Sequence, residues 1–260
     1  MRSLKENFRK KSKSPFQINK KSIYGVMEII LSELKNIFIA KLNKEMTKEK
    51  RVLKYVLSKG RRNDPENVLE IIDECGYKKF FLMNIGDKKG QILEEYIISS
   101  KAKNILELGV YLGYSTIRIA RSINDEAHIH SIEVNKNFLE IAKQHLDFAG
   151  LSDKVSFFQG KASEIIPQLN TQYDFIFIDH WKEAYLHDLK LLIQHDCLND
   201  GAIVFADNIV LFLGVHDNDW SQKCFLYHQN QPLLFSEHLS YYQEHLDFGS
   251  FPNNRCCTIQ

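Results

Sequence analysis

The sequence predicts an α/β protein with a parallel, doubly wound sheet, helices on both faces and antiparallel strands near the C-terminus. After Lys103, short apolar runs alternate with segments of helical periodicity, which is the pattern of successive strand–helix–strand units. A glycine-containing turn follows the first run, as expected where a helix N-terminus approaches a ligand. Acids end two later runs, at the edge where such sheets bind their ligands.

The expected elements follow one another in a regular order along the chain. Before the sheet, helices are expected over residues 50–57, 68–75 and 86–99, the second introduced by Asp64 as N-cap and Pro65 in the first turn. Strands are expected at 104–108, 128–133, 154–159, 174–179 and 202–207, with helices between them at 114–123, 135–148, 162–169 and 185–195. Residues 224–227 and 255–259 are expected to form two closing antiparallel strands.

Composition limits the class of protein. The chain has 260 residues, 44% of them hydrophobic, which is enough for one α/β domain plus an extension. A net charge of +1 is not that of a dedicated nucleic-acid binder. Five cysteines without a C-x-x-C pair argue against a disulfide framework and favour a reducing compartment, so we expect a cytoplasmic protein.

The first 44 residues form an expected extension, and residues 45–260 form the expected domain. Residues 1–21 contain eight bases and one acid, and residues 23–38 repeat apolar positions at helical spacing. Glu28, Glu33 and Lys35 rule out an ordinary membrane span in that helix. Three interpretations stay open: a helix packed on the domain or a partner protein, a peripheral membrane anchor, or a mitochondrial-type targeting segment.

Two acid-terminated strands predict a metal site. Asp179 ends one apolar run and Asp207-Asn208 ends another, so the side chains should meet at one edge of the parallel sheet. Two carboxylates and an amide oxygen suit Mg²⁺, which keeps positions free for water and substrate. Lys182, three residues after the first acid, places a potential base beside that ion.

The first strand–helix turn indicates which nucleotide is bound. Glu107 precedes Gly109 and Gly113, while Tyr111 takes the place of the second glycine of a dinucleotide motif, which disfavours NAD and FAD. An acid before the turn suits the ammonium and sulfonium of S-adenosylmethionine better than a pyrophosphate. Glu133 ends the second strand, where an acid can accept the hydroxyls of an adenosine ribose.

With these motifs in place, the chain resembles the catechol O-methyltransferase family from about Glu49 to the C-terminus, less closely after Asn208. The resemblance implies a Rossmann-like S-adenosylmethionine methyltransferase fold and Mg²⁺-dependent methyl transfer to one hydroxyl of a catechol-type small molecule. The matching stretches are residues 86–91, 106–115, 147–155, 165–169, 179–182 and 206–208.

The resemblance also implies the roles of individual residues. The Mg²⁺ ligands would be Asp179, Asp207 and Asn208, and the catalytic residues would be Lys182 as base and Glu244, which binds the second hydroxyl. S-adenosylmethionine would contact Ile85, Glu107, Gly109, Tyr111, Ser115, Glu133, Val134, Ala162, Asp179 and His180. The catechol would contact Met83, Trp181, Lys182, Asn208 and Glu244.

Three departures from the family pattern bear on specificity. Phe81 stands where the family carries a tryptophan, Ala162-Ser163 replaces a Ser-Gln pair beside the adenine, and Phe212 replaces a proline. Together with the N-terminal extension, they motivate an alternative function, that of a weak or inactive methyltransferase-fold subunit acting as a scaffold. Another vicinal diol or a bulkier phenol as acceptor is a third hypothesis.

Overall fold

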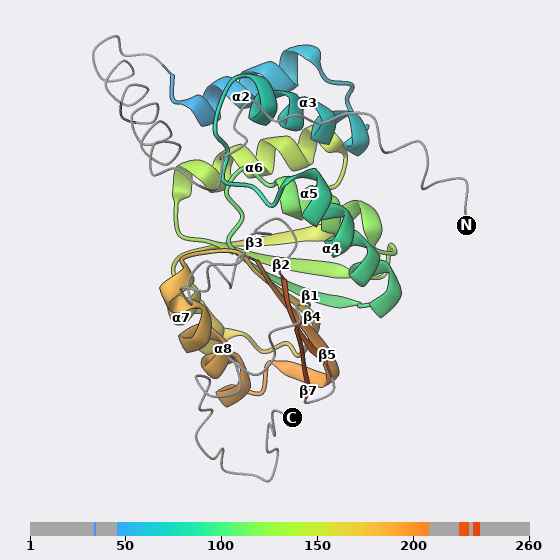
Figure 1. The fold of residues 1–260 in the computed structure, drawn as a ribbon, viewed down its shortest axis with the longest axis vertical. Coiled ribbons are helices and arrows are strands. Elements are labelled where there is room, and N and C mark those ends of the chain that lie inside the picture. Colours follow the sequence, from blue (N-terminus) through green and yellow to red (C-terminus); the bar gives the residue numbers. More distant parts are fainter. Residues whose placement is uncertain (1–33, 35–45, 208–223, 229–230, 235–260) are drawn as a thin grey trace.

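The computed structural model describes Leu34 and residues 46–207, 224–228 and 231–234. Within these residues, seven strands form one sheet in the order β3-β2-β1-β4-β5-β6-β7 (Figure 1). The strands are β1 (Asn104–Leu108), β2 (His128–Glu133), β3 (Val155–Gln159), β4 (Tyr173–Ile178), β5 (Leu198–Asp207), β6 (Cys224–His228) and β7 (Gln231–Leu234). Strands β1 to β5 pair in parallel, whereas β6 and β7 are antiparallel. The predicted fold class is therefore confirmed.

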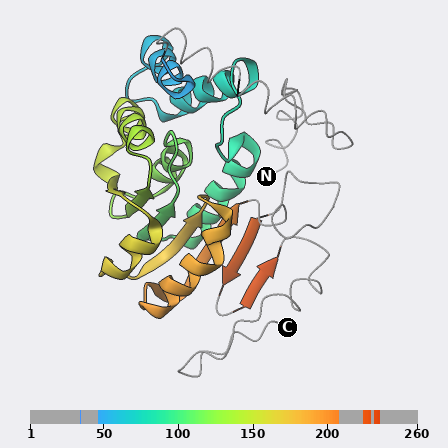
Figure 2. The ribbon, with the colours of Figure 1, turned by 90° about the vertical axis from the view of Figure 1, so that its left-hand side faces the viewer.

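Helices cover both faces of the sheet. They are α2 (Lys48–Lys59), α3 (Pro65–Lys78), α4 (Gly86–Ser100), α5 (Tyr114–Ser122), α6 (Lys136–Ala149), α7 (Ala162–Ile165) and α8 (Tyr185–Gln194). One apolar cluster packs the helices from α2 through α6 against one face of the sheet. A second cluster packs α7 and α8 against the other face. Figure 1 shows these two groups on opposite sides of the strands, and Figure 2 shows β6 and β7 at one edge of the sheet.

Local sequence signals explain where the helices begin and end. The Asp64 carboxylate accepts the backbone N–H of Asn67 and caps α3, with Pro65 at its first position as predicted. The Asn135 side chain caps α6 in the same way. Gly150 ends α6 in the left-handed conformation that glycine adopts without steric cost.

The structure differs from the sequence predictions in a few places. The helix expected over 162–169 is α-helical only to Ile165 and continues as a 3₁₀ turn, because Pro167 has no N–H to donate to an α-helical ladder. Strand β5 begins at Leu198, four residues before the predicted start. Strand β6 confirms the expected strand at 224–227, β7 was not predicted, and residues 255–259 lie outside the described residues.

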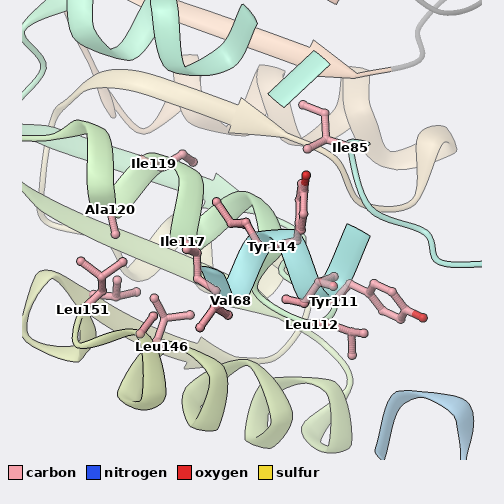
Figure 3. Close-up of a cluster of buried hydrophobic side chains, with 14 of the residues drawn as sticks. Val68, Ile85, Tyr111, Leu112, Tyr114, Ile117, Ile119, Ala120, Leu146 and Leu151 are labelled. Atoms are coloured by element: carbon pink, nitrogen blue, oxygen red, sulfur yellow. The ribbon is translucent and has the colours of Figure 1, made fainter. Parts of the chain in front are cut away.

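The cluster beside α5 and α6 fixes the glycine turn at the end of β1. Figure 3 shows Tyr111, Leu112 and Tyr114 with Leu146 among the apolar side chains of this cluster. The Tyr114 hydroxyl donates to the Asp73 carboxylate at 2.9 Å, so its polar end is satisfied although the ring is buried. The turn is thus held by packing from two helices.

The N-terminal extension lies outside the described residues, apart from Leu34, and the division between residues 44 and 45 stays a prediction. Among the residues that the structure describes, none of the helices combines the length and the apolarity that crossing a bilayer requires.

Candidate active site at the carboxyl edge of the sheet

The carboxyl ends of β1, β2 and β4 meet at one edge of the sheet, where the predicted site residues lie. The Gly109 N–H donates to the Ile132 carbonyl at 3.0 Å, and the Asp179 N–H donates to the Leu108 carbonyl at 2.8 Å. These bonds align the ends of neighbouring strands, so that the glycine turn and Asp179 are adjacent. Ligands of open α/β sheets bind at such an edge.

Two carboxylates and two ammonium groups form a cluster at this edge. The Lys182 Nζ donates to Asp179 Oδ1 at 2.9 Å, to the Asp207 carbonyl at 3.1 Å, and to the Tyr185 hydroxyl. The Lys89 Nζ reaches both carboxylate oxygens of Asp207, at 2.5 and 2.6 Å. Lys182 therefore links the ends of β4 and β5 and lies beside the two strand-end acids.

The electrostatics of the cluster favour a bound cation. Burial, followed by the nearby charge of Asp207, raises the pKa of Asp179 to about 6, and the ammonium groups of Lys182 and Lys89 oppose this rise. A carboxylate whose pKa is raised by a neighbouring carboxylate lies where positive charge is stabilised. The oxygen-only donor set of Asp179 and Asp207 fits a hard divalent ion such as Mg²⁺.

Part of the predicted metal and substrate set lies outside the described residues, namely Asn208 and Glu244, as does Phe212. Within the described part of the chain, no group of three or more His, Cys, Asp or Glu side chains could hold a metal ion. The cluster at the sheet edge contributes two acidic residues, Asp179 and Asp207, and the predicted third metal ligand is an asparagine. A site of this composition relies on water and substrate oxygens for its remaining positions.

Glu133 organises the backbone of the glycine turn. Its Oε2 accepts the N–H groups of Val110 and Tyr111 at 3.0 and 2.9 Å, and its Oε1 accepts the N–H of Asn135 at 2.8 Å. Tyr111 has a φ of +50°, so it adopts the left-handed conformation at the position where a dinucleotide motif has glycine. Because these contacts hold Glu133 at the end of β2, its carboxylate has one position relative to the turn.

Glu107 lies beneath the turn in a network of hydroxyl groups. Ser115, Thr116 and Ser131 each donate to its carboxylate, at 2.6 to 2.7 Å. Burial raises the pKa of Glu107 to about 7, while the three hydroxyl donors act in the opposite direction. Contact of Glu107 with the cofactor stays a prediction, whereas the structure shows that Glu107 connects β1, β2 and α5.

His180 is held by an acid that the sequence analysis did not single out. Its Nε2 lies 2.6 Å from Asp188 Oδ2, and its ring stacks on Tyr185 at a centroid distance of 5.2 Å. Burial alone would raise the pKa of Asp188, but the hydrogen bonds with His180 and His187 outweigh it and lower that pKa. The imidazole therefore has a fixed orientation.

Lys89, Tyr185 and Asp188 are the functional candidates that the sequence analysis did not identify. Lys89 lies within the matching stretch 86–91, where its position in an amphipathic helix resembles that of any surface lysine. Tyr185 and Asp188 follow Lys182 at intervals of three residues, which would place them on one side of a helix starting there. That spacing is the sequence feature from which Tyr185 and Asp188 could have been identified.

Three large apolar side chains next to the ends of β2, β4 and α4 are exposed. Met83, Val134 and Trp181 are 57%, 60% and 72% exposed, although each is large and hydrophobic. They follow or precede elements whose ends lie at the carboxyl edge, where a ligand with an aromatic ring would cover them. In contrast, the predicted cofactor residues Ile85 and Ala162 are buried.

The Tyr111 side chain is also buried, and it contacts residues of α2 and α6. Its hydroxyl donates to Glu49 at 3.2 Å, and its ring packs edge-on against Phe138 of α6. The backbone N–H of Tyr111, which bonds to Glu133, is the part of the residue that lies beside the predicted cofactor position.

Comparison with known proteins identifies relatives. A mouse catechol O-methyltransferase is 42% identical over 170 residues, covering 64% of this chain and 64% of that protein. A catechol O-methyltransferase from Bos taurus is 36% identical over 188 residues, covering 70% of this chain and 67% of that protein. The chain thus spans just under two thirds of the length of the mouse relative.

A solved structure shares the fold. An O-methyltransferase from Streptomyces achromogenes involved in tomaymycin synthesis, in complex with SAM, aligns with a TM-score of 0.50 at 22% identity, covering 72% of this chain and 78% of that one. The O-methyltransferase family model matches residues 59–239, well over half of the sequence, and includes every described element from α3 to β7. The chain belongs to the O-methyltransferase family.

Proposed function

We propose that this protein transfers a methyl group from S-adenosylmethionine to one hydroxyl of a catechol-type substrate, with Mg²⁺ as the required metal. The observation that carries the proposal is the position of Lys182, which bonds to both Asp179 and the backbone of Asp207. Strand-end acids suited to a divalent ion and a base for a hydroxyl proton are thereby within one cluster. The named catechol O-methyltransferase relatives support the same substrate class.

The glycine turn and Glu133 are proposed to bind S-adenosylmethionine. A carboxylate has roughly four acceptor positions, and backbone N–H groups use three of those of Glu133, which leaves capacity for a ribose hydroxyl. A Cβ at Gly109 would lie 2.4 Å from the Asp179 carbonyl oxygen, so the turn and the end of β4 are in contact. A methyl donor bound at this turn would be adjacent to the acceptor oxygen.

Lys182 is proposed to remove the hydroxyl proton. A phenol with a pKa near 10 is largely protonated at neutral pH, and its oxygen is then a poor nucleophile. When bound, Mg²⁺ would hold two vicinal oxygens and stabilise the phenolate as a Lewis acid. The Lys182 Nζ, fixed by Asp179 and Tyr185, would take the proton in its neutral amine form, while Trp181 and Met83 would cover the aromatic ring.

The proposal is tested with radiolabelled S-adenosylmethionine and two isomeric acceptors. Catechol has vicinal hydroxyls that can chelate one ion, whereas resorcinol has the same composition but cannot. We expect methylation of catechol and little of resorcinol. Equal methylation of both would contradict the chelation mechanism. The scaffold alternative predicts no binding of S-adenosylmethionine in calorimetry at millimolar concentration.

A further inference from the structure

Lys89 of α4 forms an enclosed ion pair with Asp207 at the end of β5, 118 residues later in the sequence. Its ammonium lies 2.5 and 2.6 Å from the two carboxylate oxygens. The Lys89 side chain is 14% exposed and that of Asp207 is 2% exposed, so solvent screens the pair much less than it would at the surface. Both oxygens of the carboxylate thus face one ammonium group.

The same oxygens are the ones proposed to bind the metal. In the structure, the charges of Asp179 and Asp207 are balanced by the ammonium groups of Lys182 and Lys89. A divalent ion bound to Asp207 would lie within a few ångströms of the Lys89 ammonium, and like charges at that range repel each other strongly in a buried site. The ammonium and the metal ion therefore compete for the Asp207 oxygens.

We propose that Lys89 is an internal counter-ion that competes with the divalent cation for Asp207 and thereby sets the affinity of the site. This inference rests on the proposed Mg²⁺ dependence. Before loading, Lys89 holds the Asp207 carboxylate in place and offsets its repulsion with Asp179. On loading, Lys89 gives up at least one carboxylate oxygen. Lys89 is a positioning residue, because it acts through Asp207.

The proposal predicts two effects of opposite sign when the ammonium is removed. Without a metal, the protein becomes less stable, since a buried carboxylate loses its partner. At the same time it binds the metal more tightly, because a competitor and a repelling charge are both gone. A lysine that only anchored α4 to β5 would lower stability without raising the affinity.

The experiment compares the wild-type protein with Lys89→Met, Lys89→Arg and Lys88→Met. Lys88 is the exposed neighbour on the same helix and serves as the matched control. Isothermal titration calorimetry measures Mg²⁺ binding without methyl donor or acceptor, and the melting temperature is measured in EDTA and in excess Mg²⁺. We expect Lys89→Met to bind Mg²⁺ at least about tenfold more tightly and to melt lower in EDTA.

The conservative variant and the control complete the test. Lys89→Arg keeps the charge and should remain within about threefold of the wild-type affinity, as should Lys88→Met. An unchanged or weaker affinity of Lys89→Met, beside measurable binding by the wild-type protein, overturns this inference alone. No binding by either protein overturns the proposed metal dependence and this inference with it. Binding of Mg²⁺ by Lys89→Met but not by the wild-type protein supports the inference. If Lys89→Met does not fold, Lys89→Gln takes its place.

Discussion

The ammonium of Lys182 lies 2.9 Å from the Asp179 carboxylate, three residues earlier in the chain, and also contacts the backbone of Asp207. One side chain thus connects the ends of two parallel strands. The relationship gives Lys182, the proposed base, a fixed position relative to the acids proposed to hold the metal.

Replacing Lys182 with alanine should lower turnover of a catechol by a factor of about 10² to 10⁴, the usual contribution of a general base. Binding of S-adenosylmethionine should stay nearly unchanged, because Glu133 and the glycine turn do not contact Lys182 in the described structure. Initial rates and calorimetry measure the two effects. Lys190→Ala, on the exposed side of α8, is the matched control. Undiminished turnover by Lys182→Ala would refute its role as base.

Replacing Glu133 with glutamine should weaken binding of S-adenosylmethionine by about ten- to a hundredfold. The amide keeps one acceptor oxygen but turns an N–H₂ group toward backbone donors at Val110 and Tyr111 or at Asn135. Calorimetric titration with the cofactor measures the change. Glu140→Gln, on exposed α6 surface, should bind as the wild-type protein does. Equal affinities of the two variants would argue against a cofactor role for Glu133.

Replacing Gly109 with alanine should destabilise the protein and disturb the acid–lysine cluster together. Its φ is +96°, and a Cβ would lie 2.4 Å from the Asp179 carbonyl oxygen and 2.7 Å from the carbonyl carbon, so the end of β4 would have to move. Gly201→Ala, with φ +80° and no atom within 4 Å of the added Cβ, isolates the backbone strain of about 1–2 kcal/mol. Chemical denaturation should show a clearly larger loss for Gly109→Ala, and similar losses would contradict the predicted steric clash.

The buried His145 predicts a dependence of stability on pH. Its Nδ1 lies 2.8 Å from the Leu112 carbonyl, its Nε2 has no hydrogen-bond partner among the described residues, and burial lowers its pKa from 6.5 to about 4. Between these pH values the unfolded chain binds a proton that the folded protein does not. The free energy of unfolding should therefore fall by about 3 kcal/mol as the pH drops from 6.5 to 4, on account of this group alone.

Denaturation of the wild-type protein and His145→Gln across pH 4 to 7 isolates this contribution, because all other titrating groups are common to both. The stability difference between the two proteins should narrow as the pH falls from 6.5 to 4. Parallel curves would show that His145 does not titrate as its burial predicts.

The fold could be predicted from the sequence because hydrophobic periodicity and turn residues indicate the same elements over most of residues 104–207. The strands β1 and β2 have the predicted bounds, since apolar runs there are bordered by turn residues on both sides. Strand β7 was not predicted, because its four residues contain Pro232, which is untypical of a strand interior. Proline is tolerated there because β7 is the edge strand of the described sheet.

The site could be predicted only in part, because some of its contacts join residues that are far apart in the sequence. Asp179, Lys182 and Asp207 could be expected to lie together, because parallel strands share one carboxyl edge. The pairing of Lys89 with Asp207 depends on how α4 packs against the sheet, which no local pattern encodes. The three hydroxyl donors to Glu107 likewise come from two other elements, α5 and β2, so their meeting depends on tertiary packing.

The measurement that tests the account most directly is methyl transfer from radiolabelled S-adenosylmethionine to catechol, in EDTA and after Mg²⁺ is added back. The acids of the cluster are proposed to hold the ion that orients the diol beside Lys182. We therefore predict no transfer in EDTA and full recovery with Mg²⁺. Transfer to catechol at an undiminished rate in EDTA would contradict the account.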